Sequence, residues 1–114
     1  MKKLFMVVAA VAFLLGGSMA VRAYEGTYEG IQFYCTITGK KSVMAFTAVG
    51  STSTTVIIRS TAYDKEGKAI GSGGNAGGGY ASTNYNVSGE IEYALQEHEV
   101  PSYGELLKIV EYAY

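Results

Sequence analysis

The sequence predicts an all-β protein, a small antiparallel β-sandwich or barrel-like domain of about seven strands after an N-terminal signal peptide. Three observations lead to this expectation. Residues 30–38 alternate apolar and polar side chains with a period of two, which is typical of a half-buried strand. Short runs rich in Ile, Val, Thr and Tyr follow, separated by turns of Gly, Ser and Asn. No run has the spacing of a long helix.

Residues 1–23 have the three parts of a secretory signal peptide. Two lysines come first, an unbroken apolar run covers residues 4–15, and small residues follow it. This run is shorter than the roughly 20 apolar residues of a membrane-spanning helix, so we expect a cleaved signal and no membrane span. Cleavage after Ala20 or after Ala23 fits, and the second leaves residues 24–114 as a single secreted β domain. The short signal is typical of bacteria.

The first strand of that domain, residues 30–38, should turn Cys35 toward the core and Tyr34 away from it. A second apolar run, residues 42–49, is short and contains β-branched residues, which favours a strand over a helix. On this run Phe46 and its neighbours two residues away face one side, and the intervening residues face the other.

Residues 55–63 are dense in β-branched side chains, which suit a pleated strand. The polar segment 64–67 predicts a hairpin turn in which Gly67 takes the left-handed conformation, and residues 68–70 begin the return strand. Residues 71–79 contain six glycines among nine positions, so we expect a mobile loop there. Shortening that loop to a turn should leave the melting temperature nearly unchanged.

Strand character returns at residues 80–88 and again at residues 90–100, where apolar and polar side chains alternate. Residues 102–114 fit either a short helix with a capping box or a strand. Because the last residues are rich in Ile, Val and Tyr, we favour a final strand from about Leu107, after one helical turn.

The composition excludes several classes of protein. A formal net charge of -1 does not supply the clustered basic face of a nucleic-acid-binding protein. A single Cys excludes an internal disulfide framework and a Cys-rich zinc module. A Ser-His-Asp triad is formally available with His98 and Asp64, but no spacing supports it. We therefore expect no enzyme, no cofactor and no metal site.

The only Cys and the only His of the sequence each need a separate interpretation. Cys35 shares a strand face with apolar neighbours, so we expect a buried, inert thiol. Its alternative is an intermolecular disulfide, because an odd Cys in a secreted protein can pair with another chain. His98 lies between Glu97 and Glu99, which point to the opposite face of a strand, so we expect an exposed, titratable side chain.

Tyrosine is the most unusual feature, and all ten tyrosines follow the predicted signal peptide. Exposed Tyr suits glycan and protein surfaces because it combines an apolar ring with a polar hydroxyl. Cross-strand pairing within a sheet is the alternative explanation for most of them. We select Tyr34, Tyr80 and Tyr85 as candidate ligand-binding residues, because Tyr34 lies opposite a core face and the other two follow the glycine-rich segment.

These features predict a small secreted, non-catalytic protein, a binding or structural module at or outside the bacterial cell surface. The partner we expect is a cell-wall glycan or a surface protein, not nucleic acid. The sequence YEGTY at residues 24–28 is similar to the opening of lactococcin 972-type bacteriocins, which are small secreted β proteins. That resemblance covers five residues of 114, without the Trp and His content of that family. It implies the alternative function, a bacteriocin-like antagonist of competing cells.

Overall fold

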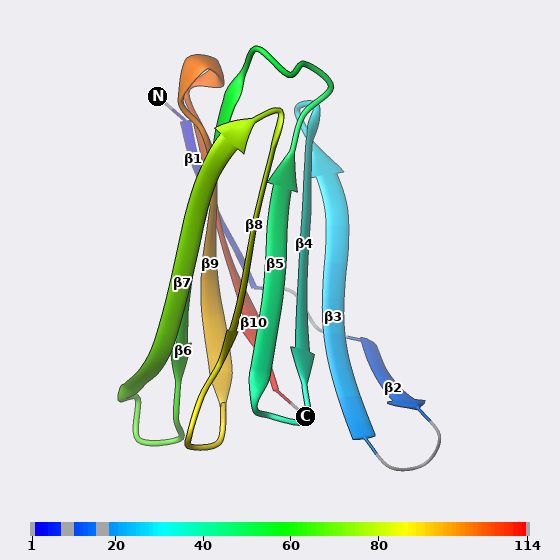
Figure 1. Cartoon of the computed structure of the whole chain (residues 1–114), viewed down its shortest axis with the longest axis vertical. Helices are drawn as coiled ribbons and strands as arrows, with labels where there is room; N and C mark the ends of the chain where they lie inside the picture. Colours follow the sequence, from blue (N-terminus) through cyan, green and yellow to red (C-terminus); the bar gives the residue numbers. More distant parts are fainter. Residues whose placement is uncertain (1, 8–10, 16–18, 114) are drawn as a thin grey trace.

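The chain forms a β-sandwich of two sheets, as the sequence predicts (Figure 1). The computed structural model describes residues 2–7, 11–15 and 19–113, with side chains described from residue 24 to residue 113. The elements are β1 (Lys2–Val7), β2 (Val11–Leu15), β3 (Met19–Tyr28), β4 (Ile31–Thr38), β5 (Ser42–Ala48), β6 (Thr55–Tyr63), β7 (Ala69–Gly78), β8 (Tyr80–Asn86), β9 (Tyr93–Val100), the 3-10 turn η1 (Pro101–Tyr103) and β10 (Glu105–Tyr112). One sheet, here called the β9 sheet, has the order β1-β10-β9-β6-β7, and the other, the β5 sheet, has the order β2-β3-β4-β5-β8.

Paired strands run antiparallel, except that β1 runs parallel to β10. Buried and exposed side chains alternate along most strands, so each sheet turns one face toward the other. The alternation predicted for β4 is confirmed, with Ile31, Phe33, Cys35 and Ile37 all in the core. Small and β-branched residues from β5, β6, β9 and β10 fill the rest of the space between the sheets.

The β6–β7 hairpin has the predicted turn. The N–H of Gly67 donates to the carbonyl of Asp64 at 2.9 Å, and the N–H of Asp64 donates to the carbonyl of Lys68 at 2.9 Å. Gly67 has a φ of 79°, which is the left-handed conformation that glycine adopts without strain. The Asp64 carboxylate accepts from the N–H groups of Glu66 and Lys68, so one side chain holds the turn closed.

The predicted mobile loop at residues 71–79 is wrong, because most of this segment belongs to strand β7. β7 is the edge strand of the β9 sheet and lies against β8, the edge strand of the β5 sheet (Figure 1). A Cβ at Gly71 would lie 2.5 Å from Cγ1 of Val87, and one at Gly73 would lie 2.9 Å from the ring of Tyr85. The glycines therefore let the edges of the two sheets close on each other.

β9 begins later than predicted, and this shifts which of its residues are buried. The chain bends at Glu92, so the alternation that starts at Ile91 does not continue into the strand. Ile91 is buried, and so are the even-numbered residues of β9 from Ala94 onward. The last part of the chain confirms the predicted helical turn followed by a final strand. η1 is one helical turn, Gly104 ends it with a φ of 70°, and β10 follows.

β1 lies beside β10 and β2 lies beside β3, each at the edge of a sheet (Figure 1). The predicted signal peptide of residues 1–23 covers both strands and the first part of β3, and its removal stays a prediction. Of the small residues that follow the predicted apolar run, residues 16–18 lie outside the described residues. No helix in the described part of the chain is long and apolar enough to cross a membrane.

Candidate functional site

A row of three aromatic rings crosses the outer face of the β5 sheet. Tyr34 on β4 and Phe46 on β5 are cross-strand partners, and their rings stack with 5.2 Å between centroids and 17° between planes. Tyr80 on β8 extends the row, with its ring 5.5 Å from that of Phe46 and tilted by 39°. The side chain of Tyr80 is 53% exposed. Tyr34, Phe46 and Tyr80 are called the β5-sheet row below.

Two of the three tyrosines selected from the sequence thus lie in one row, and Phe46 joins them. Sequence reasoning missed Phe46, although a signal for it was present. The β4–β5 turn pairs Thr38 with Ser42, and counting back from that pair sets Phe46 opposite Tyr34. Because cross-strand partners share a face, an outward Tyr34 requires an outward Phe46.

The outer face around the β5-sheet row is polar but almost uncharged. Among the described residues that face outward from β3, β4, β5 and β8, Glu25 is the only charged one. A shallow groove beside the row is lined chiefly by Tyr34, Thr36, Thr38, Ser42, Met44, Asn84 and Asn86. The Ser42 hydroxyl donates to Oδ1 of Asn86 at 2.6 Å, which leaves the amide N–H groups of Asn86 as donors.

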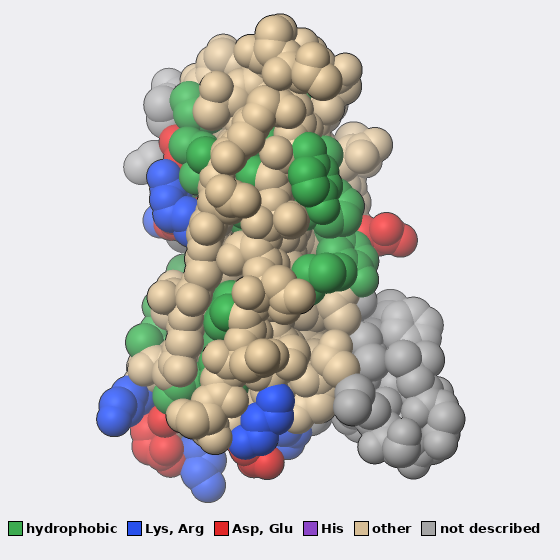
Figure 2. Space-filling view, in the orientation of Figure 1, with side chains coloured by type: hydrophobic (Ala, Val, Ile, Leu, Met, Phe, Trp, Pro, Cys, Tyr) green, Lys and Arg blue, Asp and Glu red, His purple; other side chains and the backbone are tan. Residues whose placement is uncertain are grey.

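The space-filling view shows the same contrast (Figure 2). Hydrophobic side chains gather on the right-hand side, along the β5 sheet, with an acidic side chain beside them. Blue and red side chains gather at the lower end, near the turns that join β4 to β5, β6 to β7 and β8 to β9. The aromatic face is therefore separate from most of the charge on the visible surface.

The single histidine lies inside the sandwich, so its predicted exposure is wrong. His98 is 0% exposed, because the bend before β9 turns the even-numbered residues of this strand inward. Its Nε2 lies 2.7 Å from the hydroxyl of Tyr24, and its Nδ1 lies 2.9 Å from Oγ1 of Thr47. The ring of Phe33 packs against the imidazole, with 5.6 Å between the centroids.

Gln96, two residues before His98, is also buried and connects both sheets. The carbonyls of Ala94 and Ile109 lie 3.3 and 3.2 Å from its amide nitrogen when that nitrogen faces them. Since carbonyls can only accept, the nitrogen takes this side and also donates to the hydroxyl of Tyr24 at 3.2 Å. The amide oxygen then accepts from Oγ of Ser60 at 2.9 Å.

These contacts form a chain of hydrogen bonds that runs in one direction. Tyr85 donates to Ser60 at 2.7 Å, Ser60 donates to Gln96, and Gln96 donates to Tyr24. Tyr24 donates to Nε2 of His98, which leaves Nδ1–H to donate to Thr47. Because Tyr24, Thr47 and Tyr85 come from the β5 sheet and the others from the β9 sheet, the chain ties the sheets together. The buried polar chain, as it is called below, consists of Tyr85, Ser60, Gln96, Tyr24, His98 and Thr47.

Burial sets the protonation of this chain. It lowers the pKa of His98 to about 3, against a small opposing effect of a hydrogen bond with the backbone of Phe46, so the imidazole is neutral at physiological pH. Burial raises the pKa of Tyr85 to about 12, and it raises the pKa of Tyr24 well above its ordinary value. Both hydroxyls therefore keep the protons that the chain uses.

The other two selected residues face inward. Tyr85 is half-buried and its hydroxyl is bonded to Ser60, so its expected exposure is not what the structure shows, and it does not join the β5-sheet row. Cys35 is 0% exposed, which confirms the expected burial, and that burial raises the pKa of its thiol well above the ordinary value. Because Cys35 would have to leave the core to meet another chain, the structure gives the intermolecular disulfide no support.

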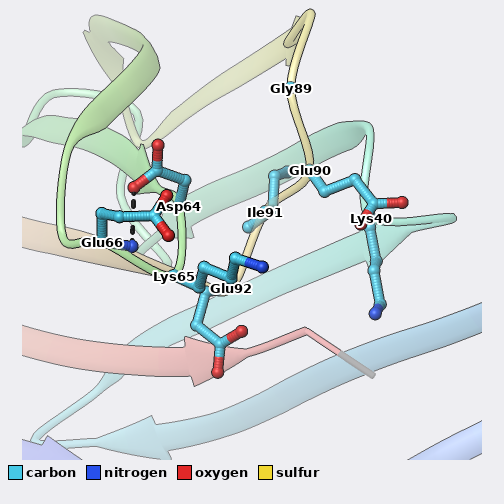
Figure 3. A pocket seen from close by; sticks show the side chains of 8 residues that line it. All are labelled: Lys40, Asp64, Lys65, Glu66, Gly89, Glu90, Ile91 and Glu92. Atoms are coloured by element: carbon cyan, nitrogen blue, oxygen red, sulfur yellow. Dashed lines mark hydrogen bonds between the residues drawn. The ribbon is translucent and has the colours of Figure 1, made fainter.

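A pocket at the lower end of the sandwich gathers the charged turns (Figure 3). It is lined by Lys40, Asp64, Lys65, Glu66, Gly89, Glu90, Ile91 and Glu92. Asp64 is engaged with the turn backbone, and the side chains of Glu90 and Glu92 point away from each other. Within the described ranges, no group of His, Cys, Asp and Glu side chains is placed to hold a metal ion. His98 has Tyr24 and Thr47 as its ring partners, so no triad with Asp64 forms.

No protein-family model matches the chain, and no curated protein or solved structure matches it either. The similarity of residues 24–28 to lactococcin 972-type bacteriocins therefore has no family match behind it. The β5-sheet row, argued from its own residues, is the candidate functional site.

Proposed function

We propose that the protein is a small secreted, non-catalytic binding module that acts at or outside the bacterial cell surface, and that the β5-sheet row binds a cell-wall glycan. The observation that carries the proposal is the line of rings made by Tyr34, Phe46 and Tyr80 on an outer face. Aromatic side chains stabilise a sandwich by burial, and this line of rings instead faces outward and ends in the exposed Tyr80, which favours a surface that another molecule covers.

The chemistry of the face favours a glycan over a protein partner. Sugar rings present C–H groups that pack on aromatic rings, and their hydroxyls exchange hydrogen bonds with amides and hydroxyls at the edge. The β5-sheet row supplies the rings, while Gln32 on β4 and Asn84 and Asn86 on β8 supply amides on the same face. The near absence of charge among the described outward residues fits an uncharged polymer.

The row is also held in place before any ligand arrives. Tyr34 and Phe46 pair across adjacent strands in the middle of a sheet, so their rings lose little freedom on binding. Side chains alternate between the two faces along each strand, so Tyr34 and Phe46, as cross-strand partners, lie on the same face. The predicted signal peptide adds the second part of the argument, because an exported protein of this kind meets wall glycans first.

The test is cosedimentation of the purified protein with purified bacterial cell wall across a salt series. We expect pelleting that persists at high salt, because ring stacking is not screened as charge attraction is. Tyr34→Ala and Tyr80→Ala should each weaken pelleting by at least about tenfold, since a few aromatic residues carry most of the binding energy of such surfaces. Tyr103→Ala is the matched control, because Tyr103 is 45% exposed but lies in η1 outside the row.

Two outcomes would contradict the proposal. Wild-type protein that stays in the supernatant at every salt concentration excludes the wall as the ligand. Equal losses for Tyr34→Ala and for the Tyr103→Ala control would show that the row has no special part in binding. Killing of an indicator strain by protein that does not pellet would favour the bacteriocin-like alternative instead.

A further inference from the structure

The two sides of the sandwich are closed in different ways. On one side β7 passes directly into β8 at Gly79, which has a φ of 77°, and the glycines of β7 let these two edge strands pack on each other. On the opposite side the edge of the β9 sheet is β1, whose residues 2–7 run parallel to residues 105–110 of β10 (Figure 1). The domain thus closes its first side with its own strands, whereas β10 is covered by part of the predicted signal peptide.

β10 has few of the features that protect the edge strand of a sheet. Its inward side chains Leu107 and Ile109 are 1% and 0% exposed with β1 in place. Residues 106–110 contain no proline, and they pair with β9 without a bulge. Their one charged side chain, Lys108, lies 3.5 Å from Glu97 in an ion pair on the outer face. An uncovered strand of this kind offers a row of backbone N–H and C=O groups to another strand.

We infer that the removal of residues 1–23 uncovers the β10 edge, and that a second copy of the processed chain then pairs with this edge to form a dimer. The pairing of β1 with β10 supports the inference, because it shows that the edge accepts a further strand along most of its length. In the full chain the predicted signal peptide therefore also serves as a cover that keeps the edge from associating. The inference goes beyond the proposed function: it shares the predicted cleavage with that function, but not the binding of a glycan.

A second copy suits this edge because one symmetric contact covers both molecules. A two-fold axis through β10 sets the strand antiparallel to its copy, so the two β9 sheets join into one and neither β10 edge stays open. Direct partners share a face, so the pairing is centred on one residue. Centring it on Lys108 would oppose two ammonium groups, whereas centring it on Leu107 or Ile109 sets two apolar side chains together on the inward face. The inward acids Glu105 and Glu111 lie at the two ends of β10, so the middle of the edge stays apolar.

The experiment measures the mass of the protein in solution by light scattering, over a range of concentrations. The secreted protein, with its N-terminus read by mass spectrometry, should start after the predicted cleavage and should be a dimer. The full chain, produced without export, should be a monomer because β1 covers its β10 edge. A synthetic peptide with the sequence of residues 2–7 should convert the dimer to monomer, because it occupies the same edge. A peptide with the same residues in scrambled order is the control.

A new charge on the edge should weaken the dimer. Val110 is half-buried and faces outward from β10. Val110→Lys should raise the dissociation constant of the dimer at least about tenfold, because the two-fold symmetry brings the new charge to the interface twice. Ser72→Lys on the exposed side of β7 is the matched control and should leave the constant unchanged. Circular dichroism verifies the fold of both variants, and the peptide measurement decides if Val110→Lys does not fold.

The inference is overturned by any of four results: a processed chain that stays monomeric at every concentration, a secreted chain that keeps residues 1–23, a full chain that dimerises as strongly as the processed one, or a dimer that neither the peptide nor Val110→Lys weakens. A processed monomer that still pellets with cell wall would leave the proposed function standing. A dimer that does not pellet would remove glycan binding and leave this inference in place.

Discussion

Tyr24 and Tyr34 lie on adjacent strands, yet the structure uses them in opposite ways. Tyr24 is 4% exposed, and its hydroxyl joins His98 and Gln96 in the buried polar chain. Tyr34 faces outward, and its ring stacks on Phe46. Inside the sandwich the hydroxyl matters, because a buried polar group needs its partners. On the outer face the ring matters. Substitutions in the interior should therefore change the free energy of unfolding, and substitutions in the β5-sheet row should change binding.

The close approach of β7 and β8 should show the largest interior effect. Gly73→Val adds a branched side chain where a Cβ alone would already meet Tyr85, so it must push the two sheet edges apart. We expect a loss of about 3 kcal/mol in the free energy of unfolding, measured by urea denaturation. Ser72→Val on the exposed side of β7 is the matched control and should cost less than about 0.5 kcal/mol. Equal values for the two variants would restore the mobile-loop interpretation.

β7 also shows why sequence patterns predicted some strands and missed this one. The alternation of β4 and the β6–β7 turn depend on residues a few positions apart, so the chain itself carries those signals. The glycines of β7 depend on Tyr85 and Val87, which lie in the other sheet. Glycine has both the smallest side chain and the largest backbone freedom. Composition alone does not show which of these two properties the fold needs in β7.

The residues in and around the candidate site also differ in whether local sequence patterns could place them. Tyr34 could be placed outside from alternation alone, because an unbroken strand fixes its face. His98 could not, because one bend at Glu92 changes the phase of the following strand. Tyr24 was not selected from the sequence, since its partners lie in β9, more than seventy positions away. Contacts between sheets are the part of this molecule that local patterns do not report.

Removing one hydroxyl from each setting tests the comparison directly. Tyr24→Phe keeps the ring but leaves the buried Nε2 of His98 without its donor and removes one acceptor of the Gln96 amide, so we expect a loss of about 2 kcal/mol in the free energy of unfolding. Tyr34→Phe keeps the stacked ring and should change it by less than about 0.5 kcal/mol. Both are measured by urea denaturation at neutral pH, and similar losses would remove the distinction between the two settings.

The protonation of His98 should produce a pH dependence that the outer face lacks. The folded pKa is about 3 against 6.5 for the ordinary side chain, so the unfolded chain takes up a proton first as the pH falls. The contribution of neutral His98 is therefore complete above pH 6.5 and declines toward pH 3, by about 1 kcal/mol between pH 7 and pH 5.5. His98→Gln should lack this decline when melting temperatures are compared across that range. Parallel curves for the two proteins would mean that His98 accepts a proton in the folded state.

The smallest effect should come from the charges on the outer face of the β9 sheet. The side chain of Arg59 is 50% exposed, and surface ion pairs of this kind contribute about 0.5 kcal/mol because water screens them. Arg59→Gln should therefore lower the free energy of unfolding by about that amount at low salt, and the difference should shrink at high salt. A loss as large as that of Tyr24→Phe, unaffected by salt, would show that this face helps to hold the sandwich together. The small loss that we expect means that these ion pairs do little for the fold, in contrast to the buried hydroxyl of Tyr24.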